Sequence, residues 1–170
     1  MSVFGKIFKI TTFGESHCKS VGVIINGVPS KMNLHENDLQ IQLNRRRPGQ
    51  SNISTPRDEK DKAIILSGIE NNITLGTPLC VIVNNENIKK KDYDFLSNKN
   101  YIPRPSHADY TYIKKYGLHV SSGGGFSSAR ETIGRIIGGS VAEKWLKENY
   151  NIEIIAYVKS VGHIKIPENM

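Results

Sequence analysis

The chain has 170 residues, 38% of them hydrophobic, and carries a formal net charge of +7 at pH 7. This length and apolar content are enough for one buried core, so we expect a single domain over residues 1–170. The apolar runs are far shorter than the roughly 20 residues that span a bilayer, which argues against a membrane protein. Because the N-terminus lacks a signal-peptide pattern and two cysteines are too few for a disulfide framework, we expect a cytoplasmic protein. The positive charge favours an anionic partner.

The first part of the chain is predicted to form strands and one helix. Residues 7–13 and 21–26 are rich in Ile, Val, Phe and Thr and flank a polar, glycine-containing loop. This pattern predicts a strand, a loop and a second strand. Residues 34–46 carry leucines four positions apart and stop ahead of Pro48, which predicts an amphipathic helix. The polar and charged stretch 50–62 is expected to be an exposed loop.

Two further strands and a second helix are expected in the middle of the chain. Apolar, β-branched runs at 63–67 and 78–84 predict the strands. The stretch 84–101, rich in Asn and Lys, is predicted to be a long surface connection. A Pro-Arg-Pro turn then fixes the backbone just before His107. A helix with several tyrosines is expected to follow and to end at Gly117.

The strongest helix signal lies near the end of the chain. Ser128 and Glu131 form a capping-box pattern, and apolar residues then recur at helical spacing to about Asn149. Glycines within a helix cost roughly 1 kcal/mol each relative to alanine. Close backbone packing is therefore expected at the three that this helix contains, which are Gly134, Gly138 and Gly139. Residues 152–158 are predicted to form a last strand.

An arginine cluster and two histidines are the side chains best suited to chemistry on an anion. Arg45–Arg47, followed by Pro and Gly, place planar bidentate donors at a rigid turn, a geometry that suits phosphate or carboxylate. His17 and His107 lie in loops beside arginines, serines and glycines. Because histidine side chains titrate near neutral pH, either could protonate a phosphate leaving group.

The glycine run at 123–125 precedes the long helix and could form an anion cradle, because amides at a helix N-terminus favour phosphate. A hairpin that only caps the helix is the alternative. The run matches neither the Walker pattern nor a complete dinucleotide fingerprint. No HExxH motif or Cys/His spacing indicates a metal site.

Two other functions are compatible with parts of the sequence. Residues 14–18 are similar to the G-x-S-x-G nucleophile elbow and would make Ser16 a hydrolase nucleophile, but the fifth residue is cysteine and a strand, not a helix, is predicted next. A basic module could bind RNA through Arg45–Arg47 and Lys89–Lys91. Aromatic residues are not interleaved with these charges and no RNA-binding motif is present, so we expect no nucleic-acid partner.

Four blocks, in this order and spacing, resemble the chorismate synthase family: TFGESH at 12–17, NRRRPG at 44–49, RPSHADY at 104–110 and SSARET at 127–132. The resemblance implies an α+β fold of the β-α-β sandwich type, with helices packed between antiparallel sheets, assembled as a homotetramer. It implies a lyase of the shikimate pathway. This enzyme would form chorismate by anti-1,4-elimination of phosphate from 5-enolpyruvylshikimate 3-phosphate, using reduced FMN. NADPH is the expected source of electrons, through a separate or an appended flavin reductase.

The resemblance also implies roles for individual residues. His17 and His107 are the expected catalytic residues: the first as a general acid near the substrate phosphate, the second beside the flavin to protonate it or balance its charge. Substrate binding is assigned to Ser16, Arg46, Arg47, Arg104 and Arg130. FMN binding is assigned to Phe126, Ser127 and Ser128. No metal is expected.

The chain departs from the family pattern at four positions. Cys18 and Ser106 stand where the family usually has glycine, and Phe126 and Asn52 stand where arginine is common. Two positive charges near the ligands are thereby lost, and Arg57 is the residue expected to compensate in part. Family members are considerably longer, and the chain lacks their later motifs. We therefore expect a truncated chain that binds FMN poorly and is inactive by itself.

Overall fold

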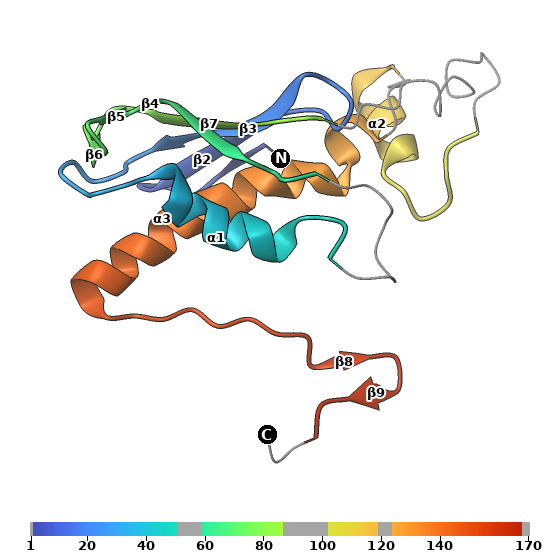
Figure 1. The fold of residues 1–170 in the computed structure, drawn as a ribbon. Helices are drawn as coiled ribbons and strands as arrows, with labels where there is room; N and C mark the ends of the chain where they lie inside the picture. Colours follow the sequence, from blue (N-terminus) through green and yellow to red (C-terminus); the bar gives the residue numbers. More distant parts are fainter. Residues whose placement is uncertain (1, 51–58, 87–101, 119–123, 168–170) are drawn as a thin grey trace.

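An antiparallel five-stranded sheet forms the centre of the fold in the computed structural model, which describes residues 2–50, 59–86, 102–118 and 124–167. Its strand order is β1-β2-β3-β7-β4 (Figure 1). The strands are β1 (Val3–Phe4), β2 (Lys9–Gly14), β3 (Ser20–Asn26), β4 (Ala63–Ser67) and β7 (Leu79–Asn84). Two small hairpins lie outside this sheet: β5 (Ile69–Glu70) with β6 (Ile73–Thr74), and β8 (Ser160–Val161) with β9 (Ile164–Lys165).

Alternating burial explains the central strands. Every second residue of β3 and β7 is buried, and Val23 lies opposite Val81 in the antiparallel register. Because successive side chains of a strand point to opposite faces, this alternation turns one apolar face of the sheet toward a single partner layer. Two helices provide that layer.

Helices α1 (Glu36–Arg46) and α3 (Thr132–Tyr150) cover one face of the sheet and pack against each other (Figure 1). Leucines of α1 and Ile133, Ile137 and Val141 of α3 are fully or almost fully buried against the sheet. Two short 3₁₀ turns, Gly125–Ser127 and Ala129–Glu131, lead into α3. Helix α2 (Asp109–Tyr116) ends at Gly117, which adopts a left-handed conformation.

The glycines of α3 allow close contact with the sheet at two of the three expected positions. A Cβ atom at Gly134 would lie 2.7 Å from Cγ2 of Thr12, and one at Gly138 would lie 2.8 Å from Cγ2 of Ile10. Gly139 is exposed and a Cβ there would meet nothing within 4 Å. The prediction of close packing is therefore confirmed for Gly134 and Gly138 and is wrong for Gly139.

The helix boundaries follow the sequence closely, with one difference at the start of α3. Ser128 does act as a cap, but for the 3₁₀ turn, since its hydroxyl oxygen accepts from the backbone N–H of Arg130 at 3.3 Å. The Glu131 side chain instead pairs with Arg135, at 2.8 Å. The α-helix then begins at Thr132, so the capping box predicted from Ser128 and Glu131 does not form.

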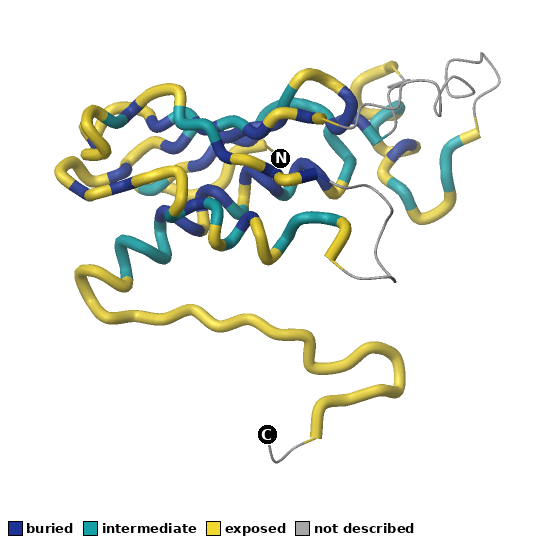
Figure 2. Tube along the Cα trace, viewed as in Figure 1, coloured by how far each residue is buried: buried dark blue, intermediate teal, exposed yellow. Residues whose placement is uncertain are grey.

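The chain after α3 differs most from expectation. Residues 152–158 are extended but pair with no strand among the described residues, so the predicted strand is not formed. All of them are exposed, as the yellow tube leading to the C-terminus shows (Figure 2). The sheet and the helices together confirm the α+β class. In the described residues, the helices form one layer that covers one face of the five-stranded sheet.

Candidate functional site

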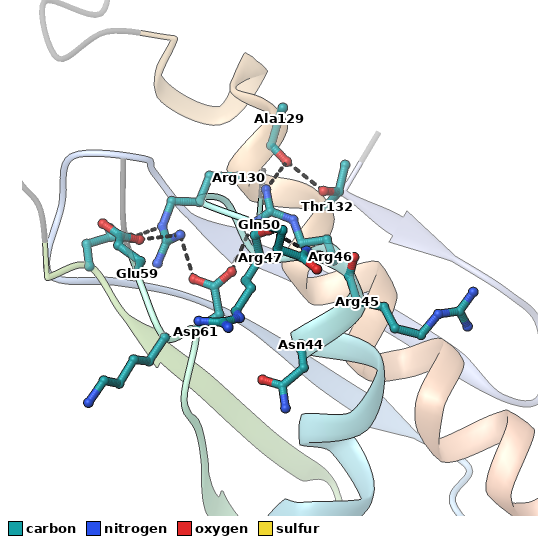
Figure 3. A network of polar contacts seen from close by, with 12 residues as sticks. Asn44, Arg45, Arg46, Arg47, Gln50, Glu59, Asp61, Ala129, Arg130 and Thr132 are labelled. Atoms are coloured by element: carbon teal, nitrogen blue, oxygen red, sulfur yellow. Dashed lines mark hydrogen bonds and ion pairs between the residues drawn. The ribbon is translucent and has the colours of Figure 1, made fainter. Parts of the chain in front are cut away.

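Helix α1 delivers the arginine cluster to the site. Arg46 follows the buried Leu43 by three positions and so lies on the same side of the helix, turned toward the protein. Its Nη1 lies 3.0 Å from Oδ2 of Asp61, and its Nη2 donates to the carbonyl oxygen of Ala129 at 3.2 Å. Arg45 is exposed and points away from Asp61 (Figure 3). One arginine of the three is therefore held from two sides.

Asp61 joins Arg46 to a second arginine. Its carboxylate has no solvent exposure, and Oδ1 lies 2.8 Å from Nη1 of Arg130. Glu59, also buried, forms an ion pair with the same Nη1 (Figure 3). Two guanidinium groups and two carboxylates thus form a compact cluster without net charge, in which only Arg46 keeps appreciable solvent contact. Charges buried in this way are tolerated because each has a partner.

Arg130 also connects this cluster to the loop after β2. Its Nε donates to Oδ1 of Asn85, and its Nη2 donates to the carbonyl oxygen of Asn84 at 3.2 Å. The side-chain amide of Asn85 in turn donates to the carbonyl oxygens of Glu15 and Cys18, at 2.9 and 2.6 Å. The loop that carries Ser16 and His17 is therefore fixed to the arginine network by hydrogen bonds at both of its ends.

His17 and Ser16 are both buried within that loop, with exposed fractions of 6% and 2%. The loop leads directly into β3, so the strand-turn-helix context of a nucleophile elbow is not present. This difference does not favour the hydrolase alternative.

A second cluster is local in sequence and lies at the start of α2. Arg104 binds Asp109 through Nε and Nη2, at 2.7 and 2.9 Å, while Nδ1 of His107 lies 2.6 Å from Oδ1 of Asp109. Two N–H groups of Arg104 donate to Asp109, which favours the ionised form of the Asp109 carboxylate. The proton in the short contact between Asp109 and His107 therefore belongs on Nδ1 of the imidazole. This arrangement leaves Nε2 of His107 as the ring atom that can exchange a proton with a ligand. Ser106, where the backbone φ is +59°, precedes it.

Tyr112 places α2 near the other blocks. Burial raises the pKa of its phenol, and Tyr116 adds to the shift, while a hydrogen bond with Ser127 acts in the opposite direction. The carboxylates of Glu131 and Glu15 also raise this pKa. The hydrogen bond with Ser127 places Tyr112 of α2 next to the turn Gly125–Ser127.

Of the residues assigned to FMN, Phe126 and Ser127 lie in the first 3₁₀ turn and Ser128 links the two turns. Ser127 bonds to Tyr112, and Ser128 caps the second turn through its hydroxyl oxygen. Phe126 is half-buried between them and Gly125. Gly124 and Gly125 belong to this turn structure, so this part of the glycine run is ordered around the start of α3.

The structure thus brings together three of the four blocks through Arg46, Arg130 and Asn85, and α2 ties the fourth to Ser127. Arg47 is half-buried beside this network and its backbone N–H closes α1 onto Leu43. Asn52, Arg57 and the lysines at 89–91 lie outside the described residues.

Sequence reasoning missed three members of the network: Glu59, Asp61 and Asn85. The stretch 50–62 was expected to be exposed, yet Glu59 and Asp61 are 1% and 2% exposed. Both lie in a segment where acidic residues and lysines follow one another, a pattern typical of solvent-exposed surface. Once the fold shows that Arg130 is buried, carboxylate partners are required, but the sequence alone does not reveal that burial.

The described residues contain no group of three or more His, Cys, Asp or Glu side chains that could hold a metal ion. Within the same parts of the chain, no helix combines the length and the apolar character needed to cross a bilayer.

Comparisons with known proteins agree with the four blocks. The sequence model of the family described as chorismate synthase matches residues 8–170. Chorismate synthase from Schizosaccharomyces pombe is 61% identical over 98% of this chain, and the chorismate synthase of Saccharomyces cerevisiae is 58% identical over 98%. A chorismate synthase from Prochlorococcus marinus (strain MIT 9215) is 53% identical over 96%. The chain spans 42–44% of the length of these three relatives.

A solved structure supports the same relationship at the level of the fold. A crystal structure of chorismate synthase matches 95% of this chain and 40% of its own chain with a TM-score of 0.69, at 29% sequence identity.

Proposed function

Because the chain belongs to the chorismate synthase family, we propose that the protein containing it is a carbon–oxygen lyase that forms chorismate from 5-enolpyruvylshikimate 3-phosphate. The observation that carries this proposal is the meeting of separate sequence blocks in one buried arginine network beside the His17 loop. The alternative functions lack such a feature. A shikimate-pathway role, in the biosynthesis of aromatic amino acids, follows from the reaction.

The proposed reaction removes a proton and a phosphate from opposite ends of a four-carbon unit and leaves a new double bond. Charge therefore builds up on the departing phosphate, which needs donors already in place. Arg46, held by Asp61 and Ala129 yet still 21% exposed, is the proposed principal donor. Arg47 and Arg104 are proposed to bind the remaining negative charges. His17 is proposed as the general acid for the phosphate.

Arg130 and Ser16 are proposed to act at this site from buried positions. Arg130 directs its guanidinium to Asp61, Glu59 and Asn85, so its main contribution would be to hold these residues in place. Ser16 lies next to His17 in the same fixed loop, and it is proposed to contact the substrate from there.

The residues proposed for FMN fit such a group in their chemistry. Ser127 and Ser128 offer hydroxyls at the start of α3, where the helix dipole favours an anion, and Phe126 offers a half-buried ring. His107, with Nδ1 committed to Asp109, can hold or deliver a proton at Nε2. Reduced FMN would supply electron density to the elimination, which has no net redox change, with NADPH as the proposed source of the reduced form.

We further propose that the exposed segment 152–158 becomes a strand of a second sheet, completing the β-α-β sandwich. Ile154 and Ala156 already line a cavity of about 360 Å³ together with Ile136 and Gly139 of α3. Six of its seven residues are apolar, with Glu153 as the exception, as in a strand covered on both faces. The partner strands would belong to the remainder of a longer protein, since relatives are more than twice as long as this chain.

The isolated chain is accordingly proposed to bind FMN poorly and to be inactive. The complete protein is proposed to be a cytoplasmic homotetramer that requires neither nucleic acid nor membrane. Size-exclusion chromatography with light scattering on the full-length protein tests the tetramer.

The decisive experiment is an anaerobic assay of the full-length protein with 5-enolpyruvylshikimate 3-phosphate and reduced FMN. We expect chorismate to form, and we expect His17→Ala and His107→Ala each to lower the rate about 100-fold or more. His163→Ala, at an exposed turn between β8 and β9, is the matched control and should keep full activity. Absence of turnover by the wild-type protein would contradict the proposed function.

A further inference from the structure

Asp61 occupies an unusual place for a carboxylate near an anion site. It bridges Arg46 and Arg130, with no solvent exposure, so its negative charge lies directly behind the guanidinium that is proposed to meet phosphate. Electrostatics alone would make this charge a disadvantage for binding a polyanion. A compensating role is therefore required.

The backbone around Asp61 is held as firmly as its side chain. The amide of Gln40, on α1, donates to the carbonyl oxygens of Lys60 and Asp61 at 3.2 and 3.3 Å. The side-chain oxygen of Gln40 accepts from the backbone N–H of Ala63 at 3.1 Å. Asp61 itself has a φ of +47°, a left-handed conformation that Asp and Asn tolerate better than most other residues.

We propose that Asp61 is a positioning residue that fixes the Arg46 guanidinium for the phosphate of the ligand. Oδ2 of Asp61 and the carbonyl oxygen of Ala129 hold the two ends of the planar guanidinium, so the group is oriented before the ligand arrives. Oδ1 of Asp61 is in turn fixed by Arg130. This inference rests on the proposed function, because it assigns Arg46 to phosphate.

The proposal makes a prediction opposite in sign to simple electrostatics. If Asp61 only neutralised Arg46, Asp61→Asn would remove a negative charge and tighten the binding of a polyanion. If Asp61 positions Arg46, the same substitution should weaken binding about tenfold, as expected for the loss of a charged hydrogen bond that orients the donor. We expect the weaker binding. It should appear as weaker phosphate binding and a lower kcat/KM, since Arg46 meets the phosphate both before and in the transition state.

The experiment uses the full-length protein with two readouts, steady-state kinetics and calorimetric binding of inorganic phosphate. Asp61→Asn is combined with Arg46→Met in a double-mutant cycle. If Asp61 acts through Arg46, its substitution should change neither readout further once Arg46 is absent. Asp38→Asn, which changes a partly exposed ion pair of Lys144, is the matched control and should leave both readouts unchanged.

Arg46→Lys keeps the inference testable if Asp61→Asn does not fold. Lysine retains the charge but cannot bind Asp61 and Ala129 together, so we expect about the same tenfold weakening. Unchanged or tighter phosphate binding by either variant would overturn the positioning role, as would a wild-type protein that does not bind phosphate. A wild-type protein that binds phosphate, with the expected order among variants, but forms no chorismate would contradict only the proposed reaction.

Discussion

The two charged clusters of this protein are built in different ways. The first joins Arg46, Asp61, Asn85 and Arg130, which are far apart in the sequence, and nearly all of it is buried. The second, Arg104–Asp109, lies within six consecutive residues and keeps a third of the Arg104 side chain exposed. Each cluster places a carboxylate between two cationic or protonatable groups.

The two clusters depend on different parts of the fold. The buried cluster exists only if β4, β7, α1 and the start of α3 are all in place, so it should fail together with the fold. The local cluster needs only the turn before α2 and the first turn of that helix. We therefore expect the first to contribute strongly to stability and the second to contribute mainly to activity.

Loss of Arg130 should give the largest effect. Arg130→Met would leave Glu59 and Asp61 buried without their shared partner, and breaking a buried pair typically costs about 3–5 kcal/mol. Urea unfolding followed by circular dichroism measures the change in the free energy of unfolding. Lys147→Met is the control, because its exposed pair with Glu153 should contribute no more than about 0.5 kcal/mol. Equal losses in the two variants would remove the distinction between the clusters.

Packing of α3 on the sheet should give the next largest effect, because this helix positions Arg130. In Gly134→Ala the new methyl would press on Thr12 and the backbone of Gly22. Overpacking costs about 1–3 kcal/mol, and the better helix propensity of alanine offsets about 1 kcal/mol, so we expect a net loss of up to about 2 kcal/mol. Gly139→Ala, in open space, should instead stabilise by up to about 1 kcal/mol. The same urea titration compares both variants with the wild type.

The sequence predicted the second cluster better than the first. The spacing of Arg104, His107 and Asp109 places them in one turn whatever the rest of the chain does, and the helix that follows was predicted to within a residue of its end. The strand at 63–67 was likewise predicted with its observed bounds, because apolar residues in short runs report local structure directly.

The partners of Arg130 could not be predicted, for a physical reason. Burial of Glu59 and Asp61 depends on how the segment before β4 crosses the end of α1, which no local pattern encodes. The failure at 152–158 has a different origin. The apolar run there, rich in Ile and Val, indicates a tendency to form a strand, but a strand forms only when another strand pairs with it.

Substitution of Asp109 should affect activity more than stability. In Asp109→Ala, Arg104 and His107 can return to solvent, so we expect a loss in the free energy of unfolding of about 1 kcal/mol or less. The orientation of the imidazole would be lost, and kcat/KM for the full-length protein should fall about tenfold or more. Asp109→Asn, which keeps an acceptor for Nδ1, should fall less. A stability loss as large as that of Arg130→Met would show that the local cluster is also part of the core.

The smallest effect should come from Tyr112, which connects the two regions. Its pKa is raised in the folded protein, chiefly by burial, so the unfolded chain releases this proton first as the pH rises. The folded protein then binds more protons than the unfolded one, and the free energy of unfolding should fall as the pH rises above about 10. Tyr112→Phe should remove this part of the decline while losing the bond with Ser127.

The measurement is urea unfolding at about pH 8 and about pH 10.5, on either side of the ordinary tyrosine pKa, for the wild type and Tyr112→Phe. Tyrosines and lysines elsewhere also titrate in this range, so only the difference between the two proteins at each pH is informative. Tyr110→Phe, at a residue 56% exposed on the same helix, is the matched control and should decline as the wild type does. A decline of Tyr112→Phe as steep as that of the wild type would mean that the phenol titrates alike in both states. In that case α2 would not be packed against the start of α3, and the local cluster would be independent of the buried one.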